Sequence, residues 1–373
     1  MLTRLHVDNW RSFVNFTVEL GSGVVLLLGD NGSGKTSIFD VLRLLKGLLL
    51  ARRPLAELLP ASSRTRWDAR ERQRFELDLA GNGGTYRYTL IVAHDTHPLT
   101  GNTIQIVSES LFHDDRVVAR FEDGKLNVHT DGGAPNASFL ADPTSSPIGN
   151  IFTGPINAKL TWFKRRLAAI HTLHIDPRHI DPWSDASAAH PDDDLQNFAA
   201  WFRGLQQRNF RTVASTFVAL KDIIPGFEEL GIDSDLHERG RLRVRCGPSG
   251  GLPATSFDFA ELSDGQRALI ALYTIRYALI GPDTTVCLDE PDNFIALREL
   301  QPWLFSVLDE TLTSRGAQAL LISHNAELID RLAHDHGVWF FREHGGPTRV
   351  RPFAEIMEGP QAPSSQIAEG VEP

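Results

Sequence analysis

Residues 23–37 read GVVLLLGDNGSGKTS: an apolar run, a glycine-rich turn and the beginning of a helical pattern. The turn matches GxxxxGK[ST], in which glycines let successive backbone N–H groups and the positive end of the next helix face a phosphate chain. Lys35 would then lie on the outer phosphates, and the Thr36 hydroxyl would coordinate Mg²⁺. An apolar strand precedes the turn and apolar residues follow it at helical spacing, which disfavours a glycine-rich loop without function. The stretch therefore predicts a nucleoside triphosphate site.

The composition is that of an ordinary globular protein. The chain has 373 residues, of which 42% are hydrophobic and 23% charged, so it can bury one large core or two smaller ones without disulfides. Cys246 and Cys287 have no partner at metal-binding spacing, which suits a reducing compartment. No apolar stretch reaches membrane-spanning length. We expect a cytoplasmic protein without a membrane partner.

The charge is distributed unevenly along the chain. A net charge of -10 disfavours indiscriminate nucleic-acid binding, yet residues 43–74 hold nine basic and three acidic residues. A second basic group opens a later helical pattern at Lys159, Lys164, Arg165 and Arg166. Two interpretations remain open for these groups: solvated helix faces, or a track for a phosphate backbone. If DNA binds, we expect it to depend on Arg64, Arg66, Arg70 and Arg72.

The first part of the chain is predicted to be rich in strands. Alternating residues predict strands at 2–8 and 13–20 before the 24–28 strand, and the helix after the glycine-rich turn should run to about residue 50. Five short runs then predict an antiparallel sheet: 75–80, 86–93, 103–112, 116–121 and 125–129. Residues 131–149, with three prolines, are predicted to form a loop.

The second part mixes helices and strands. Apolar spacing predicts a helix at 156–170 and a pair of helices within 194–220, and residues 242–246 are predicted to form a strand. After residue 255 helices and strands alternate, which is typical of an α/β fold. The tail from residue 358 to residue 373 is rich in Pro, Ser, Gly and Glu and is predicted to be disordered.

A second set of candidate site residues lies late in the chain. A buried-strand pattern ends at Asp289 and Glu290; the first can hold the Mg²⁺ shell and the second can polarise the attacking water as general base. Upstream, Ser263 is a good N-cap for the next helix, and Gly265 allows close approach to an anion. A plain capped helix explains this motif equally well. Residues 319–325 predict a strand that delivers His324, a residue type that is more often structural than catalytic.

These features, in this order, resemble those of the ATP-binding-cassette ATPases. The signature there is LSGGQ and here it is LSDGQ, with Asp264 in place of the second glycine. The opening NWRSF at residues 9–13 resembles the RecF and SMC branch, and this implies that Arg11 is a phosphate ligand. Residues 289–303 and 322–327 look like coil-less ATPases related to AbiEii-type and OLD-type AAA proteins, known from genome maintenance and phage defence, often beside a nuclease. The D-loop histidine of those proteins corresponds to Ala296, and the Q-loop residue stays open between Gln73 and Gln105.

The resemblance implies an α/β P-loop NTPase: a two-lobed ATPase head with an antiparallel β subsection and a helical insertion. The expected division is lobe one at 1–155, a helical insertion at 156–240, lobe two at 241–357 and a tail at 358–373. ATP and Mg²⁺ are the implied cofactors, with Thr36 and Asp289 on the metal and Glu290, His324 and Lys35 in catalysis. The nucleotide-binding residues are expected to be Arg11, Asn31, Gly32, Ser33, Gly34, Lys35, Thr36, Ser37, Ser263, Gly265 and Gln266.

The implied activity is ATP hydrolysis that drives an ATP-dependent homodimer and gates DNA or a separate nuclease or effector protein. Two alternatives remain open: a binding switch that hydrolyses little ATP, which the departures at Asp264 and Ala296 leave possible, and a transporter ATPase subunit. A metal cluster of His171, His174, Asp176 and His179 is disfavoured, because their segment contains a proline and need not bring the ligands together.

Overall fold

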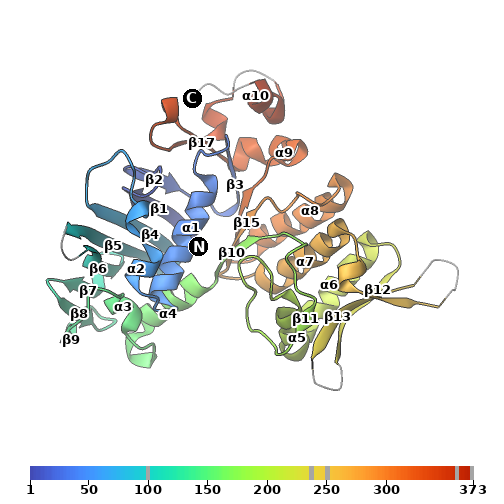
Figure 1. Ribbon diagram of the computed structural model, residues 1–373, viewed down its shortest axis with the longest axis horizontal. Helices are drawn as coiled ribbons and strands as arrows, with labels where there is room; N and C mark the ends of the chain where they lie inside the picture. Colours follow the sequence, from blue (N-terminus) through green and yellow to red (C-terminus); the bar gives the residue numbers. More distant parts are fainter. Residues whose placement is uncertain (98–100, 235–238, 248–252, 358–360, 370–373) are drawn as a thin grey trace. The chain divides into compact units, whose positions relative to one another are not determined.

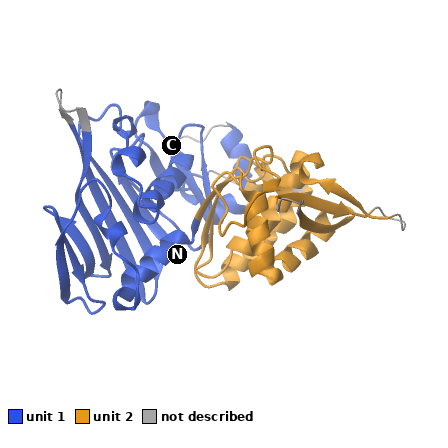
Figure 2. Ribbon diagram, turned by 60° about the horizontal axis from the view of Figure 1, so that its bottom comes forward, with its two compact units in different colours: residues 1–170, 329–373 blue, residues 171–328 orange. Residues whose placement is uncertain are grey.

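The computed structural model describes residues 1–97, 101–234, 239–247, 253–357 and 361–369. The chain forms two compact units: residues 1–170 together with 329–373, and residues 171–328 (Figure 2). The division at residues 155, 240 and 357 that the sequence suggested stays a prediction about domains.

Unit 1 contains an eight-stranded antiparallel sheet in the order β2-β1-β4-β5-β6-β7-β8-β9 (Figure 1). Its alternating strands bury one face, as the period-2 pattern predicts. The sheet confirms the predicted antiparallel strands. Its members are β1 (Leu2–Asp8), β2 (Phe16–Glu19), β4 (Arg72–Gly81), β5 (Gly84–His97), β6 (Gly101–His113), β7 (Arg116–Glu122), β8 (Lys125–His129) and β9 (Pro135–Leu140).

The prediction of a loop over residues 131–149 is wrong, because this segment forms strand β9 and the short helix α3 (Pro147–Asn150). Strand β9 pairs with β8 in register, for example Leu126 with Phe139. Pro135 is the first residue of an edge strand, a position where the missing N–H costs no internal hydrogen bond. Pairing with a preceding strand thus overrides the local proline signal.

The glycine-rich turn of unit 1 lies between strand β3 (Gly23–Gly29) and helix α1 (Lys35–Leu49). Strand β3 is buried along nearly its whole length and pairs in parallel with β17 (Gly337–Phe341), which pairs in turn with β18 (Arg349–Pro352). Helix α1 buries an apolar face, as its 3.6-residue period predicts. The short helix α2 (Leu55–Leu58) follows.

The predicted helix at 156–170 is confirmed as α4 (Ala158–Ala168). Its basic residues do not form one solvated face, because Lys164 and Arg166 are buried. The Lys164 ammonium donates to the carbonyls of Gly149 at 2.8 Å and Ile151 at 2.7 Å. Burial, together with the nearby Arg52, lowers the pKa of Lys164 to about 8. Lys164 is therefore a buried structural residue of unit 1 that links α4 to the carbonyls of Gly149 and Ile151.

Unit 2 contains a parallel pair of buried strands, β15 (Thr285–Asp289) and β16 (Gln318–Ile322), and several helices. The two helices predicted within residues 194–220 are confirmed as α5 (Phe198–Arg208) and α6 (Phe210–Ile223). Strands also occur in the segment expected to be a helical insertion. The remaining elements are β10 (Ile170–His174), β11 (Trp183–Ser184), β12 (Phe227–Ser234), β13 (Gly240–Cys246), β14 (Thr255–Asp258), α7 (Asp264–Leu279) and α8 (Leu297–Thr313).

The end of the chain contains helix α9 (Ala326–His336) and helix α10 (Pro363–Glu369). The prediction of disorder is wrong for residues 363–369, because they form α10, in which the backbone N–H of Ser364 donates to the Asp330 carboxylate at 2.7 Å. The other parts of the predicted disordered tail, residues 358–360 and 370–373, lie outside the described residues.

Candidate nucleotide-binding site

Three glycines shape the turn between β3 and α1. Gly29, Gly32 and Gly34 have φ angles of +137°, +78° and +109°, a region that side chains disfavour. A Cβ atom on Gly29 would lie 2.1 Å from the Phe340 carbonyl oxygen, whereas one on Gly32 would meet nothing within 4 Å. The first glycine is therefore required by close backbone packing, and the middle one leaves open space above the turn.

Lys35 begins helix α1 and lies under this turn. Its side chain is buried, and its ammonium donates to the carbonyl oxygens of Gly29 at 2.6 Å and Asp30 at 3.0 Å. No acidic residue stands in the first turn of α1, so the partial positive charge of the helix N-terminus is not offset locally. The Lys35 ammonium and the N-terminus of a helix therefore lie close together, which is the arrangement of an anion site.

Ser33 provides the clearest sign that the turn fits a phosphate chain. Its side chain is 3% exposed, and its hydroxyl has no hydrogen-bond partner among the described residues. A buried hydroxyl without a partner costs free energy, which a phosphate oxygen accepting a hydrogen bond from it would recover. Together with Gly32 and Lys35, this donor set fits the polyphosphate of a nucleotide.

Two residues from the end of unit 1 support the turn, and no motif in the sequence pointed to them. The Thr348 hydroxyl donates to the Ser33 carbonyl at 2.8 Å and lies 2.8 Å from the Ser12 hydroxyl. The Arg342 guanidinium lies 3.4 Å from the Gly32 carbonyl and 5.6 Å from the centre of the Trp67 ring. Thr348 and Arg342 therefore contact the backbone carbonyls of the turn and stabilise its conformation.

Arg11, predicted as a phosphate ligand, lies beside helix α1. Its guanidinium forms an ion pair with Asp40 and lies 3.5 Å from the Ser37 hydroxyl. Its φ of +50° is rare for a side-chain-bearing residue, so the backbone itself is held in a special conformation. The predicted role of Arg11 stays a prediction, and Asp40 is a partner that the sequence analysis missed.

The candidate Q-loop residues have different environments. Gln73 is buried, and its amide donates to the Asn9 carbonyl at 2.9 Å while its oxygen lies 2.8 Å from His94 Nε2. Gln105 is exposed on β6. Gln73 thus braces the segment that carries Arg11, and neither glutamine is assigned as the Q-loop residue.

In unit 2, Glu290 and His324 come together, because the parallel strands β15 and β16 end side by side. The carboxylate of Glu290 lies 3.7 Å from His324 Nε2 and accepts from the Asn293 amide at 2.6 Å. The backbone N–H of Glu290 donates to the Ile322 carbonyl at 2.9 Å, and its φ is +50°. Asn293, which the sequence analysis did not select, therefore orients the predicted general base.

Asp292 is a second acid of this site that the sequence analysis did not select. Burial raises its pKa, and the nearby Glu290 carboxylate acts in the same direction. One of its carboxylate oxygens is buried without a hydrogen-bond partner among the described residues. Groups with a perturbed pKa cluster at functional sites, so Asp292 is a candidate third acid beside Asp289 and Glu290 at this strand end.

The predicted N-cap of helix α7 is confirmed. The Ser263 hydroxyl accepts from the Gln266 backbone N–H at 3.3 Å, and the Gln266 side chain reaches back in a capping box. A Cβ atom on Gly265 would lie 2.9 Å from the Phe294 carbonyl. The Asp264 carboxylate forms an ion pair with Arg267 in the next turn of the helix. The unusual acid of this motif is therefore neutralised locally.

The histidine-rich segment shows a different arrangement. The Asp176 carboxylate accepts from Arg178 at 2.9 Å, and this contact lowers the pKa of Asp176. Among the residues that the structure describes, no group of three or more His, Cys, Asp or Glu side chains is placed to hold a metal ion.

Comparisons with known proteins agree with this geometry. Residues 4–95 match the family model of an AAA domain, and residues 176–330 match the model described as "AAA domain, putative AbiEii toxin, Type IV TA system". The DNA replication and repair protein RecF of Shewanella loihica is 46% identical over 41 residues. That stretch is 11% of this chain and 11% of RecF, so the match spans only a small part of the relative.

Similar solved structures include the SMC head domain from Thermotoga maritima, with 15% identity and a TM-score of 0.47. That likeness covers 94% of this chain and 98% of the other. Another is the SmcHead bound to the C-winged helix domain of ScpA, with 13% identity, a TM-score of 0.48, and coverage of 94% and 97%.

The fold and the phosphate-binding turn define an α/β P-loop nucleotide-binding protein, as predicted from the sequence. Within that class, two parts of the chain match AAA-domain models and a 41-residue stretch matches RecF, so these matches agree with the resemblance to AAA-type ATPases of the RecF branch that the sequence predicted. No helix in the described part of the chain has the length and hydropathy to cross a membrane.

Proposed function

We propose that this chain binds ATP with Mg²⁺ and hydrolyses it to ADP and phosphate. Lys35, the backbone of residues 31–34 and the Ser33 hydroxyl would hold the phosphates, while Thr36 and Asp289 would hold the metal. The observation that carries the proposal is the placement of Glu290 between His324 and Asn293. A protein that only binds nucleotide has no need of an oriented carboxylate at this strand end.

Glu290 is the general base of the proposed reaction. Its carboxylate would take a proton from the water that attacks the terminal phosphorus, while the bond to the bridging oxygen breaks and ADP leaves. His324, 3.7 Å from the same carboxylate, would hold the attacking water or the terminal phosphate in line. Asn293 fixes the second carboxylate oxygen, which limits the rotation of Glu290.

We propose further that ATP joins two copies of the chain, with Ser263 of one copy completing the Lys35 site of the other. The geometry that supports this proposal is a capped helix N-terminus with Gly265 packed closely beneath it. Because Arg267 neutralises Asp264, that carboxylate need not repel a phosphate. An ATP-joined dimer is also compatible with a second candidate function, a switch that binds ATP and hydrolyses little of it.

The partner class follows from the relatives. RecF is named for DNA replication and repair, and one family description names a putative toxin of a toxin–antitoxin system. We therefore propose that the dimer acts in the cytoplasm on DNA, or gates a separate nuclease or effector in genome maintenance or antiviral defence.

A mixing experiment tests the dimer and the ATPase together. Lys35→Ala and Ser263→Arg chains should each be inactive alone, but their heterodimers carry both lesions in one site and leave the other intact. Phosphate release should therefore partly return on mixing, in proportion to the heterodimers, which are measured by capturing one tagged chain together with the untagged other. Full activity of Lys35→Ala would refute the nucleotide site.

Two further outcomes separate the candidate functions. ATP-driven dimers of wild type without phosphate release would favour the binding switch. Heterodimers without recovered turnover, in a wild type shown to tolerate one inactive site, would refute the action of Ser263 across the dimer.

A further inference from the structure

Strand β9 is the open edge of the eight-stranded sheet, because it pairs with β8 and is the last strand in the sheet order (Figure 1). The last two residues of β9 are apolar and exposed: Phe139 is 56% exposed and Leu140 is 85% exposed. Exposed apolar edge strands pair readily with other chains, and proteins usually protect them with charges, bulges or covering segments. Lys and Glu are absent from β9.

The backbone of β9 has donors and acceptors that point away from the sheet. The Ala141 N–H donates to the Gly124 carbonyl at 3.1 Å, and the register pairs Leu126 with Phe139 and Val128 with Ala137. Hydrogen-bonded and non-hydrogen-bonded pairs alternate along an antiparallel ladder. Residues 137 and 139 therefore bond to β8, and Ser138 and Leu140 direct their N–H and C=O groups toward the open edge.

One face of this edge borders an apolar hollow of about 520 Å³. Leu126 and Phe139 line it from the sheet, and Phe152 and Ile156 line it from the segment between α3 and α4. The latter two side chains are 79% and 82% exposed, a large apolar area for a water-facing surface.

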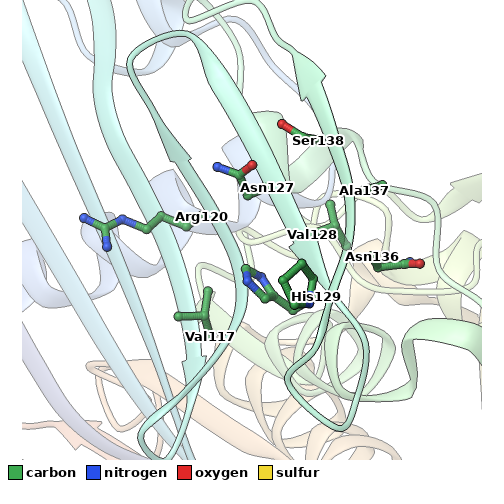
Figure 3. Close-up of a pocket in the computed structure, with 9 residues that line it drawn as sticks. Val117, Arg120, Asn127, Val128, His129, Asn136, Ala137 and Ser138 are labelled. Atoms are coloured by element: carbon green, nitrogen blue, oxygen red, sulfur yellow. The ribbon is translucent and has the colours of Figure 1, made fainter.

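The opposite face borders a second hollow of about 500 Å³, lined by both polar and apolar residues (Figure 3). Its lining includes Arg120, Asn127, His129, Asn136 and Ser138, and no acidic residue. The Nδ1 atom of His129 is buried without a hydrogen-bond partner among the described residues. Because Arg120 already forms an ion pair with Glu122 at 2.7 Å, this face suits uncharged hydroxyl or amide side chains.

We propose that an extended segment of a partner protein pairs with β9 as a ninth strand of the sheet. Successive side chains of a strand point to opposite faces, so apolar residues at alternate positions would enter the apolar hollow. The intervening polar residues would enter the hollow lined by Asn127, His129 and Ser138. The two hollows together fit an amphipathic strand, so we propose that the partner segment is amphipathic.

The dimensions of the edge favour such a segment over a second copy of this chain. β9 has six residues and is therefore about 20 Å long. Pairing two copies along it would bury much less than the roughly 1,200 Å² of a stable interface. A peptide that fills both hollows gains more contact per residue than the edge of a second copy.

A displayed library of twelve-residue peptides, apolar at odd positions and random at even ones, tests this proposal on the full-length protein. We expect enrichment of sequences with hydroxyl or amide residues at even positions. A synthetic enriched peptide should lose binding when its alternate amides are N-methylated, because these groups must pair with β9.

Variants at the edge locate the binding. Ser138→Pro removes an outward N–H without removing a bond to β8, and should weaken peptide binding by about tenfold. Ser138→Ala keeps the N–H and is the matched control with nearly unchanged affinity. Ile156→Glu should weaken binding, whereas Leu312→Glu in unit 2, at a residue that is 81% exposed, should not. Thermal unfolding of each variant checks that the fold is kept.

Two results would overturn the proposal. The first is the absence of enriched peptides, or enriched peptides that bind Ser138→Pro as tightly as wild type. The second is a nucleotide-free dimer in sedimentation that Ser138→Pro converts to monomer, which would assign the edge to a second copy of the chain.

Discussion

Replacing Glu290 by glutamine removes the proposed general base with little change of shape. The side chain is 36% exposed and has two neighbours, Asn293 at 2.6 Å and His324 at 3.7 Å. Glutamine has the same size and can still accept from Asn293, so we expect the free energy of unfolding to change by less than about 1 kcal/mol. The carboxylate charge and its ability to accept a proton are lost.

The expected effect on turnover follows from that loss. A positioned general base contributes about 10²–10⁴-fold to a rate, so kcat should fall by that factor, a rise of about 3–5 kcal/mol in the activation barrier. The affinity for ATP should change by less than about threefold, because Lys35 and the phosphate-binding turn are untouched. ATP-bound dimers should accumulate, since closure persists until hydrolysis.

Three measurements check this prediction: phosphate release in a single turnover, equilibrium binding of ATP, and light scattering with ATP and Mg²⁺. Glu229→Gln makes the same charge change at an exposed residue of β12 and should leave all three unchanged. If Glu290→Gln hydrolyses ATP within about threefold of the wild-type rate, Glu290 is not the base.

Three other predictions follow from the contacts in unit 1. Gly29→Ala should lower ATP affinity by more than about tenfold in a titration, because its Cβ would lie 2.1 Å from the Phe340 carbonyl, whereas Gly32→Ala should be milder; equal losses would contradict this. Burial lowers the pKa of Lys164 to about 8, below its unfolded value of 10.5, so its contribution to stability is lost as the pH falls through 8. Urea unfolding should therefore show wild type gaining about 2 kcal/mol over Lys164→Met between pH 8 and pH 10, and parallel curves would refute the shift. Any DNA affinity should fall steeply with salt and with reversal of the charges of Arg66 and Arg72. Arg70→Ala should have a smaller effect, because Asp8 and Asp68 already form ion pairs with Arg70. An unchanged DNA affinity after the double charge reversal would exclude this basic group.

Local chemistry allowed much of unit 1 and the site to be predicted. The glycine-rich turn, the N-cap at Ser263 and the acids at the end of β15 depend on residues close together in sequence, and each lies in the predicted element. The strands from β4 to β8 follow from alternation and from turn residues between them. In each case a few neighbouring side chains specify the backbone.

The rest depended on contacts between residues far apart in the chain. Thr348 supports Ser33 across more than 300 residues, and the position of Asn293 beside Glu290 depends on how the chain turns after β15. The segment 131–149 contains loop-forming residues, but β8 offers it a ladder of backbone hydrogen bonds. The sequence pattern allowed Lys164 to be a surface charge, whereas in the structure its buried ammonium donates to the carbonyls of Gly149 and Ile151. Tertiary structure decided these points, because the free energy of a buried polar group depends on partners that local sequence does not specify.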